Sequence, residues 1–252
     1  MDFSIPIILV ILLIAGFIKG FSGFATSMVL TAGLVFYYTP LYIIPILAML
    51  SVTLNIFLVI EHFKYIKQAK DNFALRPETI IALLAGTFIG AYFLGYLNPN
   101  IIKIVLGLFI IVFIYLIRDK IKEHKEYIKS KFWLNIIIGS VSGLFSGFIN
   151  VNGPPAMLFG LYHKYDKIKL LKAVSVFFLI ADALTIIVFY INGFYSLNSL
   201  ITYIEFIPFI IIGFLVGAYT RRHVDNTTFK KYVVILLLIL AVELLINGFG
   251  LF

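Results

Sequence analysis

The tetrapeptide FSGF occurs twice in this chain of 252 residues, at Phe21–Phe24 within FIKGFSGFATSM and at Phe145–Phe148 within VSGLFSGFINVNGPP. Both copies lie inside long apolar stretches, where glycine, serine and asparagine add no hydrophobicity. Two interruptions of the same kind, half a chain apart, predict that both stretches break and that the chain consists of two related halves.

The composition is that of a membrane protein. The chain is 62% hydrophobic and 13% charged, with a mean hydropathy of +1.07, whereas a soluble domain is nearer half apolar and about a quarter charged. Because the sequence begins Met-Asp-Phe, without a basic segment or a small-residue cleavage motif, we read the first apolar run as retained rather than as a signal peptide. The absence of cysteine excludes disulfides and thiolate metal sites.

The net charge of +8 does not predict a nucleic-acid partner, because the basic residues lie in short loops between apolar runs, as in cytoplasmic loops of membrane proteins. All four histidines also fall at basic loops without metal-ligand spacing, and we expect them at the surface: His62, His124, His163 and His223. We predict one membrane domain with no metal and no cofactor.

The apolar runs number eight, at 5–36, 41–63, 79–97, 101–117, 132–162, 173–191, 200–219 and 232–252. Six have the length of about 20 residues that crosses a hydrocarbon core of ~30 Å. The first and fifth, which carry FSGF, are too long for one crossing and too short for two. A pair of half-length helices joined at a break near the bilayer centre fits their length.

The basic residues favour re-entrant hairpins for these two runs. If all eight runs cross, Lys and Arg divide almost evenly between the two sides. If the first and fifth enter and leave on one side, 18 of the 20 basic residues collect on one side, Lys103 lies alone on the other, and Lys19 falls within the first hairpin. Because cytoplasmic loops are rich in Lys and Arg, we predict a multi-pass protein of the cell (inner) membrane with both termini outside.

A second segment is also repeated, with nearly the same spacing between its two copies as FSGF has. The segment GTFIGAY at 86–92 returns as GFLVGAY at 213–219. FSGF repeats after 124 residues and this segment after 127, which indicates a length change of only three residues. We read the pairs Gly86–Gly90 and Gly213–Gly217 as small-residue contacts between helices.

The repeats predict an all-α polytopic membrane fold in two halves, 1–120 and 130–252, each a broken hairpin followed by three transmembrane helices. Because three crossings are odd in number, the second half is inverted relative to the first. Inverted repeats with broken helices that meet near the midplane are a common plan of secondary transporters.

The breaks supply residue types that suit an anion. Returning half-helices point their N-termini, with free N–H groups and a positive dipole end, toward the protein centre. Pro154 and Pro155 suit first helical positions, and hydroxyl and amide side chains at both breaks are suited to capping. We predict that Ser27 can also cap the returning half-helix of the first break. We therefore predict substrate contacts at Ser22, Gly23, Thr26, Ser146, Gly147, Asn150, Asn152 and Gly153.

Two deep charges stand out. Lys19 precedes the first break, where a charge costs at least ~2.5 kcal/mol and needs a partner; we favour a role as counter-charge to an anionic substrate over satisfaction by hairpin carbonyls or snorkelling. Asp182 either carries a coupling proton or hydrogen-bonds the second hairpin, and Asn55 lies 127 residues before it, so the repeat sets an amide opposite an acid. Glu243 is another candidate for proton transfer.

The sequence resembles the sulfite exporter TauE/SafE family of membrane transporters. The resemblance covers FIKGFSGFATSMV, GSVSGLFSGFINVNGPPAMLFGLY and the repeated GxxxGAY segments, and is most specific at Gly143 through Pro155. It implies transport of a small sulfur-containing anion such as sulfite or an organosulfonate. Many members carry a run of glycines in the first break, where this chain has Phe24-Ala25-Thr26-Ser27.

We therefore expect a secondary transporter that exports sulfite or an organosulfonate by alternating access, not an enzyme, embedded in the lipid bilayer. A carrier of small carboxylates on the same scaffold and a passive channel are alternatives within transport. A lipid-modifying membrane enzyme is the alternative of another class, although no nucleophile–base or metal constellation supports it. Proton coupling and a homo-oligomeric state stay open.

Overall fold

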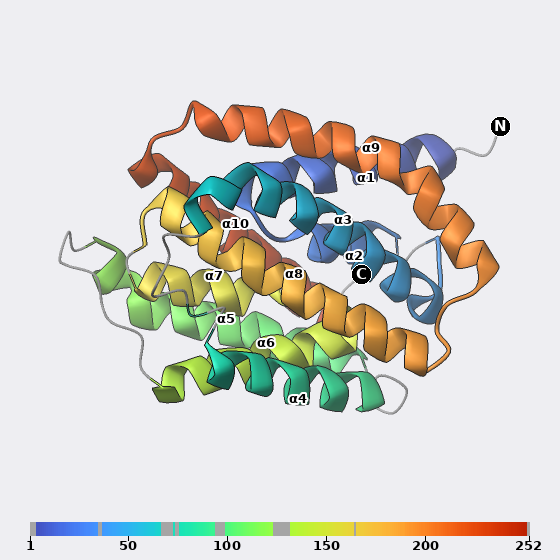
Figure 1. Cartoon of the computed structure of the whole chain (residues 1–252), viewed down its shortest axis with the longest axis horizontal. Coiled ribbons are helices and arrows are strands. Elements are labelled where there is room, and N and C mark those ends of the chain that lie inside the picture. The colour runs from blue at the N-terminus through green and yellow to red at the C-terminus, as the bar shows by residue number, and fades with distance from the viewer. Residues whose placement is uncertain are drawn as a thin grey trace.

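The computed structural model describes residues 4–34, 37–66, 73, 76–93, 99–122, 132–163 and 165–250, and these are helical with no strand among them (Figure 1). The ten helices are α1 Ser4–Ser22, α2 Thr26–Leu34, α3 Pro40–Ile66, α4 Pro77–Phe93, α5 Pro99–Lys122, α6 Phe132–Ile149, α7 Gly153–Tyr162, α8 Lys167–Ile191, α9 Leu197–Arg222 and α10 Asn226–Gly248.

The sequence marks most of the helix starts. Helices α3, α4 and α5 begin at Pro40, Pro77 and Pro99, and proline suits the first helical position because its missing N–H would have no partner there. The Asp166 carboxylate caps α8, and Ser196 with Ser199 forms a capping box at α9.

Asp225 caps α10 at the edge of the apolar region. Its carboxylate accepts hydrogen bonds from the backbone N–H groups of Thr228 and Thr227 at 3.0 and 2.9 Å. These bonds, led by that of Thr228, hold the pKa of the Asp225 carboxyl below its usual value.

Among the described residues, five helices are long and apolar enough to cross a membrane, over Ile5–Ser22, Tyr42–Glu61, Phe132–Ile149, Ile168–Ile191 and Leu197–Arg222. Shorter apolar stretches lie at Pro77–Phe93 and Lys103–Val112. Helices α3, α4, α5, α8, α9 and α10 overlap the six predicted spans, and their ends differ from the predicted ones by up to six residues. The largest differences fall at α8 and α10, because polar first turns extend these helices beyond the apolar run.

The first and fifth apolar runs are both interrupted. Helices α1 and α2 are separated by residues 23–25, and α6 and α7 by residues 150–152, so the two breaks lie 127 residues apart. Each break opens with a residue at positive φ, Gly23 at 85° and Asn150 at 54°, whose N–H bonds the carbonyl four residues earlier at 2.8 and 2.9 Å.

This spacing corrects the predicted register of the two FSGF segments. The first copy runs into its break, whereas the second ends two residues before its break, inside α6. The spacing of 127 residues, rather than 124, also joins Gly16 to Gly143 and Gly20 to Gly147, so no length change separates the two repeated segments. The two FSGF copies thus identify the broken segments, but they lie at different positions relative to the two breaks.

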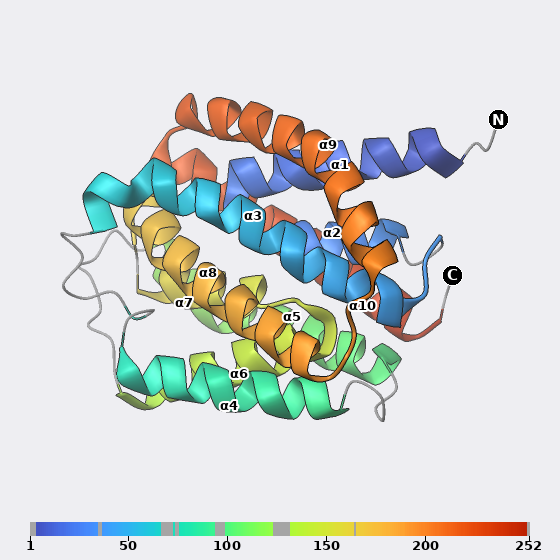
Figure 2. The same cartoon turned by 45° about the vertical axis from the view of Figure 1, so that its right-hand side comes forward.

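The helices pack in pairs drawn from opposite halves of the chain. Helix α1 packs along α9, α4 along α6, α3 along α8 and α5 along α10. In Figures 1 and 2, α3, α5, α7 and α9 end, and α4, α6, α8 and α10 begin, at the left end of the bundle, whereas α1 begins and α10 ends toward the right. The segments α1–α2 and α6–α7 therefore fold back from opposite ends.

Glycines bring the two closest pairs into backbone contact. A Cβ added to Gly143 of α6 would lie 2.3 Å from the Leu83 carbonyl oxygen of α4, and one on Gly217 of α9 would lie 2.1 Å from the Phe17 carbonyl oxygen of α1. Gly86, Gly90 and Gly213 are equally tight against the facing backbone. The predicted packing role of both small-residue pairs is confirmed.

We expect Gly90→Ala to destabilise the protein by about 1–3 kcal/mol, the usual cost of overpacking, because its new Cβ would lie 2.3 Å from the Leu144 carbonyl oxygen. Ala85→Val is the matched control, since Ala85 lies on the exposed side of the same helix. Unfolding of both variants in mixed detergent micelles measures the difference. Equal stabilities would show that α4 and α6 do not pack through their glycines.

Candidate anion-binding site

A cavity lies where the two breaks meet, and its empty space, counted together with the open solvent at its mouth, is about 260 Å³. Its walls come from both breaks, from the last turn of α1 and from one turn each of α3 and α8. The lining residues are Lys19, Phe24, Ala25, Thr26, Ser27, Met28, Ser51, Asn150, Val151, Asn152, Gly153, Pro154, Phe178 and Asp182.

Lys19 is the cation of this cavity. Its side chain is buried, with the whole residue only 4% exposed. Its Nζ lies 4.8 Å from the centroid of the Phe178 ring, a cation–π contact. Within the described part of the chain, the Lys19 ammonium forms no hydrogen bond and no ion pair within 4.0 Å. The Asp182 carboxylate lines the same cavity and attracts this ammonium from more than 4.0 Å away. A buried ammonium without a hydrogen bond favours an anionic ligand that supplies one.

The first break adds hydrogen-bond donors beside this lysine. Helix α2 begins at Thr26, and the backbone N–H groups of its first three residues have no hydrogen-bond partner among the described residues, as expected for a helix N-terminus. The Thr26 hydroxyl is buried and likewise has no partner in that part of the chain. Free N–H groups at the positive end of a helix, together with a hydroxyl and an ammonium, suit a small anion.

Asp182 organises the opposite wall. Its Oδ2 accepts a hydrogen bond from Asn55 of α3 at 2.7 Å, and its Oδ1 accepts one from Asn152 of the second break at 2.6 Å. With the Asn150 amide oxygen accepting from Ser27 Oγ and the Ala48 N–H, each at 3.1 Å, the Asn150 nitrogen lies 3.2 Å from Asp182 Oδ1 and donates to it. One carboxylate thus holds amides from α3 and from both ends of the second break.

The second break offers fewer donors to a ligand than the first. Pro154 and Pro155 occupy the first turn of α7, as predicted, and neither has an N–H group. Asn152 occupies the N-cap position but makes no capping bond, because its side chain is directed to Asp182 instead. The two breaks therefore differ in chemistry: the first provides the donors and the second is fixed in place.

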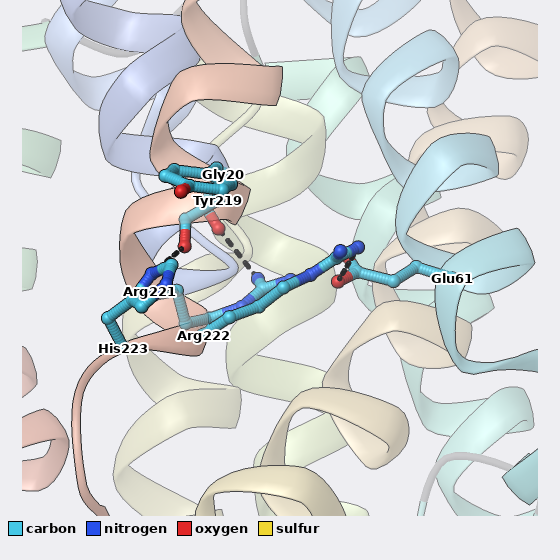
Figure 3. Close-up of polar contacts among 6 residues, drawn as sticks. All are labelled: Gly20, Glu61, Tyr219, Arg221, Arg222 and His223. Atoms are coloured by element: carbon cyan, nitrogen blue, oxygen red, sulfur yellow. Dashed lines mark hydrogen bonds and ion pairs between the residues drawn. The ribbon is translucent and has the colours of Figure 1, made fainter.

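A second polar group supports the end of α1 next to Lys19. Figure 3 shows Arg221, at the end of α9, reaching the Gly20 carbonyl of α1 and the Glu61 carboxylate of α3. The Arg221 side chain is 3% exposed, and its Nη1 donates to the Gly20 oxygen at 2.6 Å. This oxygen is one of the last four carbonyls of α1, which lack partners within the helix. Arg222 reaches the same carboxylate at 3.4 Å from an exposed position.

A family model described as Sulfite exporter TauE/SafE matches residues 8–244, nearly the whole chain and both breaks. The chain belongs to this family. It is therefore a multi-pass membrane protein of a transporter family. Searches of curated proteins and of solved structures found no significant match.

This TauE/SafE protein brings together six of the ten predicted site residues around the cavity: Lys19, Thr26, Asn150, Asn152, Gly153 and Asp182. The other four do not line it. Ser22 donates to the Ile18 carbonyl at 2.7 Å, Gly23 forms the turn of the first break, and Gly147 packs against α4. Ser146 shares a hydrogen bond of 2.7 Å with Thr185 and receives the Asn152 amide at 3.4 Å.

Two cavity residues that sequence reasoning did not select carry a helical signal. Ser51 precedes Asn55 by four residues on α3, and Phe178 precedes Asp182 by four on α8. Residues four apart lie on one face of a helix. Once Asn55 and Asp182 are placed at the cavity, Ser51 and Phe178 are therefore expected to face it too. The predicted pairing of Asn55 with Asp182 is confirmed by their hydrogen bond.

The predicted surface position is wrong for one histidine of the four. His163 ends the second broken segment and is fully buried, with its ring 4.3 Å from that of Phe159. It follows the apolar helix α7 directly and packs with it. The prediction failed because it inferred exposure from the basic residues that follow His163 in the sequence. His223 is exposed as expected, His124 lies outside the described residues, and so does the side chain of His62.

We expect Arg221→Met to destabilise the protein by about 3–5 kcal/mol, because it removes a buried cation and with it the hydrogen bond to the Gly20 carbonyl at the end of α1. The adjacent Arg222→Met is the control and should cost about 0–1 kcal/mol, since that side chain is 66% exposed. Unfolding in mixed detergent micelles compares the two. Similar losses for both arginines would refute the assigned role of Arg221.

Proposed function

We propose that this protein is a secondary transporter that moves a small anion, sulfite or an organosulfonate, across the cell membrane by alternating access. The observation that carries the proposal is the buried ammonium of Lys19, which faces a cavity between two helix breaks without a hydrogen bond or ion pair among the described residues. Family membership supports the substrate class.

In this proposal the first break binds the anion. The Lys19 ammonium supplies the counter-charge, and the Thr26 hydroxyl and the free N–H groups at the start of α2 supply hydrogen bonds. Charge-assisted bonds of this kind are roughly twice as strong as neutral ones. Phe178, Val151 and Met28 limit the cavity on its apolar side, which favours a compact anion over an extended one.

Asp182 couples the anion to a proton in this mechanism. A carboxylate and a bound anion in one cavity repel each other, so protonation of Asp182 favours anion binding. Protonation also turns one carboxylate oxygen from an acceptor into a donor. Because that carboxylate accepts from Asn152 and Asn55, its protonation loosens the hold of α3 and α8 on the second break.

The two halves, 1–120 and 130–252, act as inverted repeats in the proposed cycle. Three features support this. The breaks lie 127 residues apart, and the two broken segments fold back from opposite ends. In each half, the first helix of the broken segment packs against the same helix of the other half: α1 against α9, and α6 against α4. In inverted repeats, motion of one half against the other exposes a fixed midplane site to each side in turn.

With re-entrant hairpins at α1–α2 and α6–α7, the chain segments rich in Lys and Arg all connect helices at the end of the bundle where α8 and α10 begin. We assign that end to the cytoplasm because basic loops concentrate there. Both termini then lie outside, and the anion passes from the end with the basic loops to the end where α1 begins.

Flux through liposomes tests the function. The purified protein is given an imposed proton gradient and offered sulfite, thiosulfate, several sulfonates and small carboxylates. Loss of a hydrogen bond to a charged group, about 1.5–3 kcal/mol, predicts that Lys19→Ala lowers uptake about 10–100-fold. Lys231→Ala, at an exposed lysine of α10, is the control and should transport normally. Asp182→Asn should still pass the anion, with its uptake no longer responding to the proton gradient.

Each result has a different meaning. Full activity in Lys19→Ala would keep the transporter and remove Lys19 from its site. Selective flux of carboxylates would replace the sulfur oxyanion as substrate. No flux from folded wild-type protein across the whole panel would overturn the proposed function.

Single cysteines test the topology, since the chain has none of its own. In intact cells we expect an impermeant thiol reagent to label Asn198→Cys, at the start of α9, and to spare Ser130→Cys, Asp166→Cys and His223→Cys until the cells are permeabilised. The positions 130 and 166 flank the α6–α7 segment. Labelling of one of these two without the other would eliminate the second hairpin.

A further inference from the structure

A second cavity lies beside the first, and its empty space, counted together with the open solvent at its mouth, is about 340 Å³. It is bounded by α2, by the second break with the end of α6, by α5 and by α10. Its lining residues are Met28, Thr31, Lys103, Ile149, Val151, Glu243, Leu244 and Asn247.

The two cavities share a wall. Met28 and Val151 line both of them, and these two side chains are almost completely buried, at 2% and 3% exposure. One comes from the first turn after the first break and the other from within the second break. These two apolar residues, one from α2 and one from the second break, therefore lie between the second cavity and the one that holds Lys19.

The second cavity lies toward the end of the bundle where α1 begins and α10 ends. At 1.5 Å per residue, Lys103 is about 6 Å from the start of α5, Glu243 about 7.5 Å from the end of α10, and Thr31 about 4.5 Å from the end of α2. All three of these helix ends lie away from the end of the bundle where α8 and α10 begin (Figures 1 and 2). A ligand that left the first cavity through the shared wall would pass this chamber next.

The chemistry of the chamber suits an anion in transit. Lys103 forms no hydrogen bond and no ion pair within 4.0 Å among the described residues, and the Thr31 hydroxyl has no partner there either. Glu243 accepts a hydrogen bond from the Asn247 amide at 2.5 Å. One cation attracts an anion, and one nearby carboxylate limits how tightly the anion is held. Conduction requires this balance between entry and release.

We propose that the second cavity is an anion chamber on the transport path, with Lys103 as its anion-attracting group and Met28 with Val151 as the gate to the central site. The proposal rests on the proposed function, because it extends the path of the same anion toward the side of the termini. It assigns Lys103 and Glu243 to substrate passage rather than to helix packing.

Thiol reactivity tests the chamber without transport. Thr31→Cys is treated from the side of the termini with an anionic and a cationic methanethiosulfonate reagent, and the two reaction rates are compared. Removal of a nearby charge should lower the ratio of anionic to cationic rates about tenfold in Thr31→Cys with Lys103→Gln. Glu243→Gln should raise that ratio. Asn198→Cys is the control, and its ratio should not respond to Lys103→Gln.

The outcomes separate the chamber from the proposed function. A ratio that ignores Lys103→Gln, or a Thr31→Cys thiol that reacts with neither reagent in folded protein, would overturn the chamber even if the anion is transported. The expected change in ratio supports the chamber even if the liposome assay fails.

The gate is tested by enlarging the side chains that form it. Met28→Trp should abolish anion flux, because the larger side chain fills the wall that Met28 forms between the two cavities. Ile239→Trp, an equally large substitution at an exposed position of α10, is the control and should transport as the wild type does. If Met28→Trp does not fold, Val151→Phe replaces it as the enlarged gate residue. Wild-type flux through a folded protein with either enlarged residue would refute the gate.

Discussion

The structure depends on the hydrogen bonds that Asp182 accepts at the second helix break. Non-helical backbone at membrane depth is tolerated only where protein or trapped water satisfies its polar groups. Asn55 and Asn152 both donate to this carboxylate, and one of them belongs to the break itself. A charged acceptor at this depth is costly alone, and these amides offset the cost while they fix α3, α8 and the break relative to one another.

The first break is secured differently, and that difference leaves its donors available. Glycines hold α1 against α9 at backbone contact, and Arg221 satisfies a carbonyl at the end of α1 while it bridges to Glu61. These contacts fix the helix that carries Lys19 from behind. The ammonium and the N–H groups at the start of α2 therefore face the cavity and form no hydrogen bond with the described residues, while the Asp182 carboxylate in the same cavity attracts the ammonium.

The sequence predicted the helical class, the two broken segments and most of the polar cavity residues, because glycine, proline and charge are conspicuous in apolar runs. It misplaced the correspondence of the FSGF copies, since a shared tetrapeptide in a Phe-rich chain carries less positional information than the glycines spaced by 127 residues. Arg221 was counted with the loop charges because its position in sequence resembles theirs. The burial of Arg221 depends on the packing of α9 against α1, which the sequence around Arg221 does not predict.

Positions related by 127 residues carry different chemistry at the centre of the molecule. Lys19 corresponds to Ser146, and Asp182 corresponds to Asn55. A symmetric pair of identical half-length subunits would place two ammonium groups, or two carboxylates, next to each other at the centre. Joining the halves in one chain lets each diverge, so that one half contributes the cation and the other the acid. The central ammonium and carboxylate then balance in charge, and the two breaks present chemically distinct surfaces to the cavity between them.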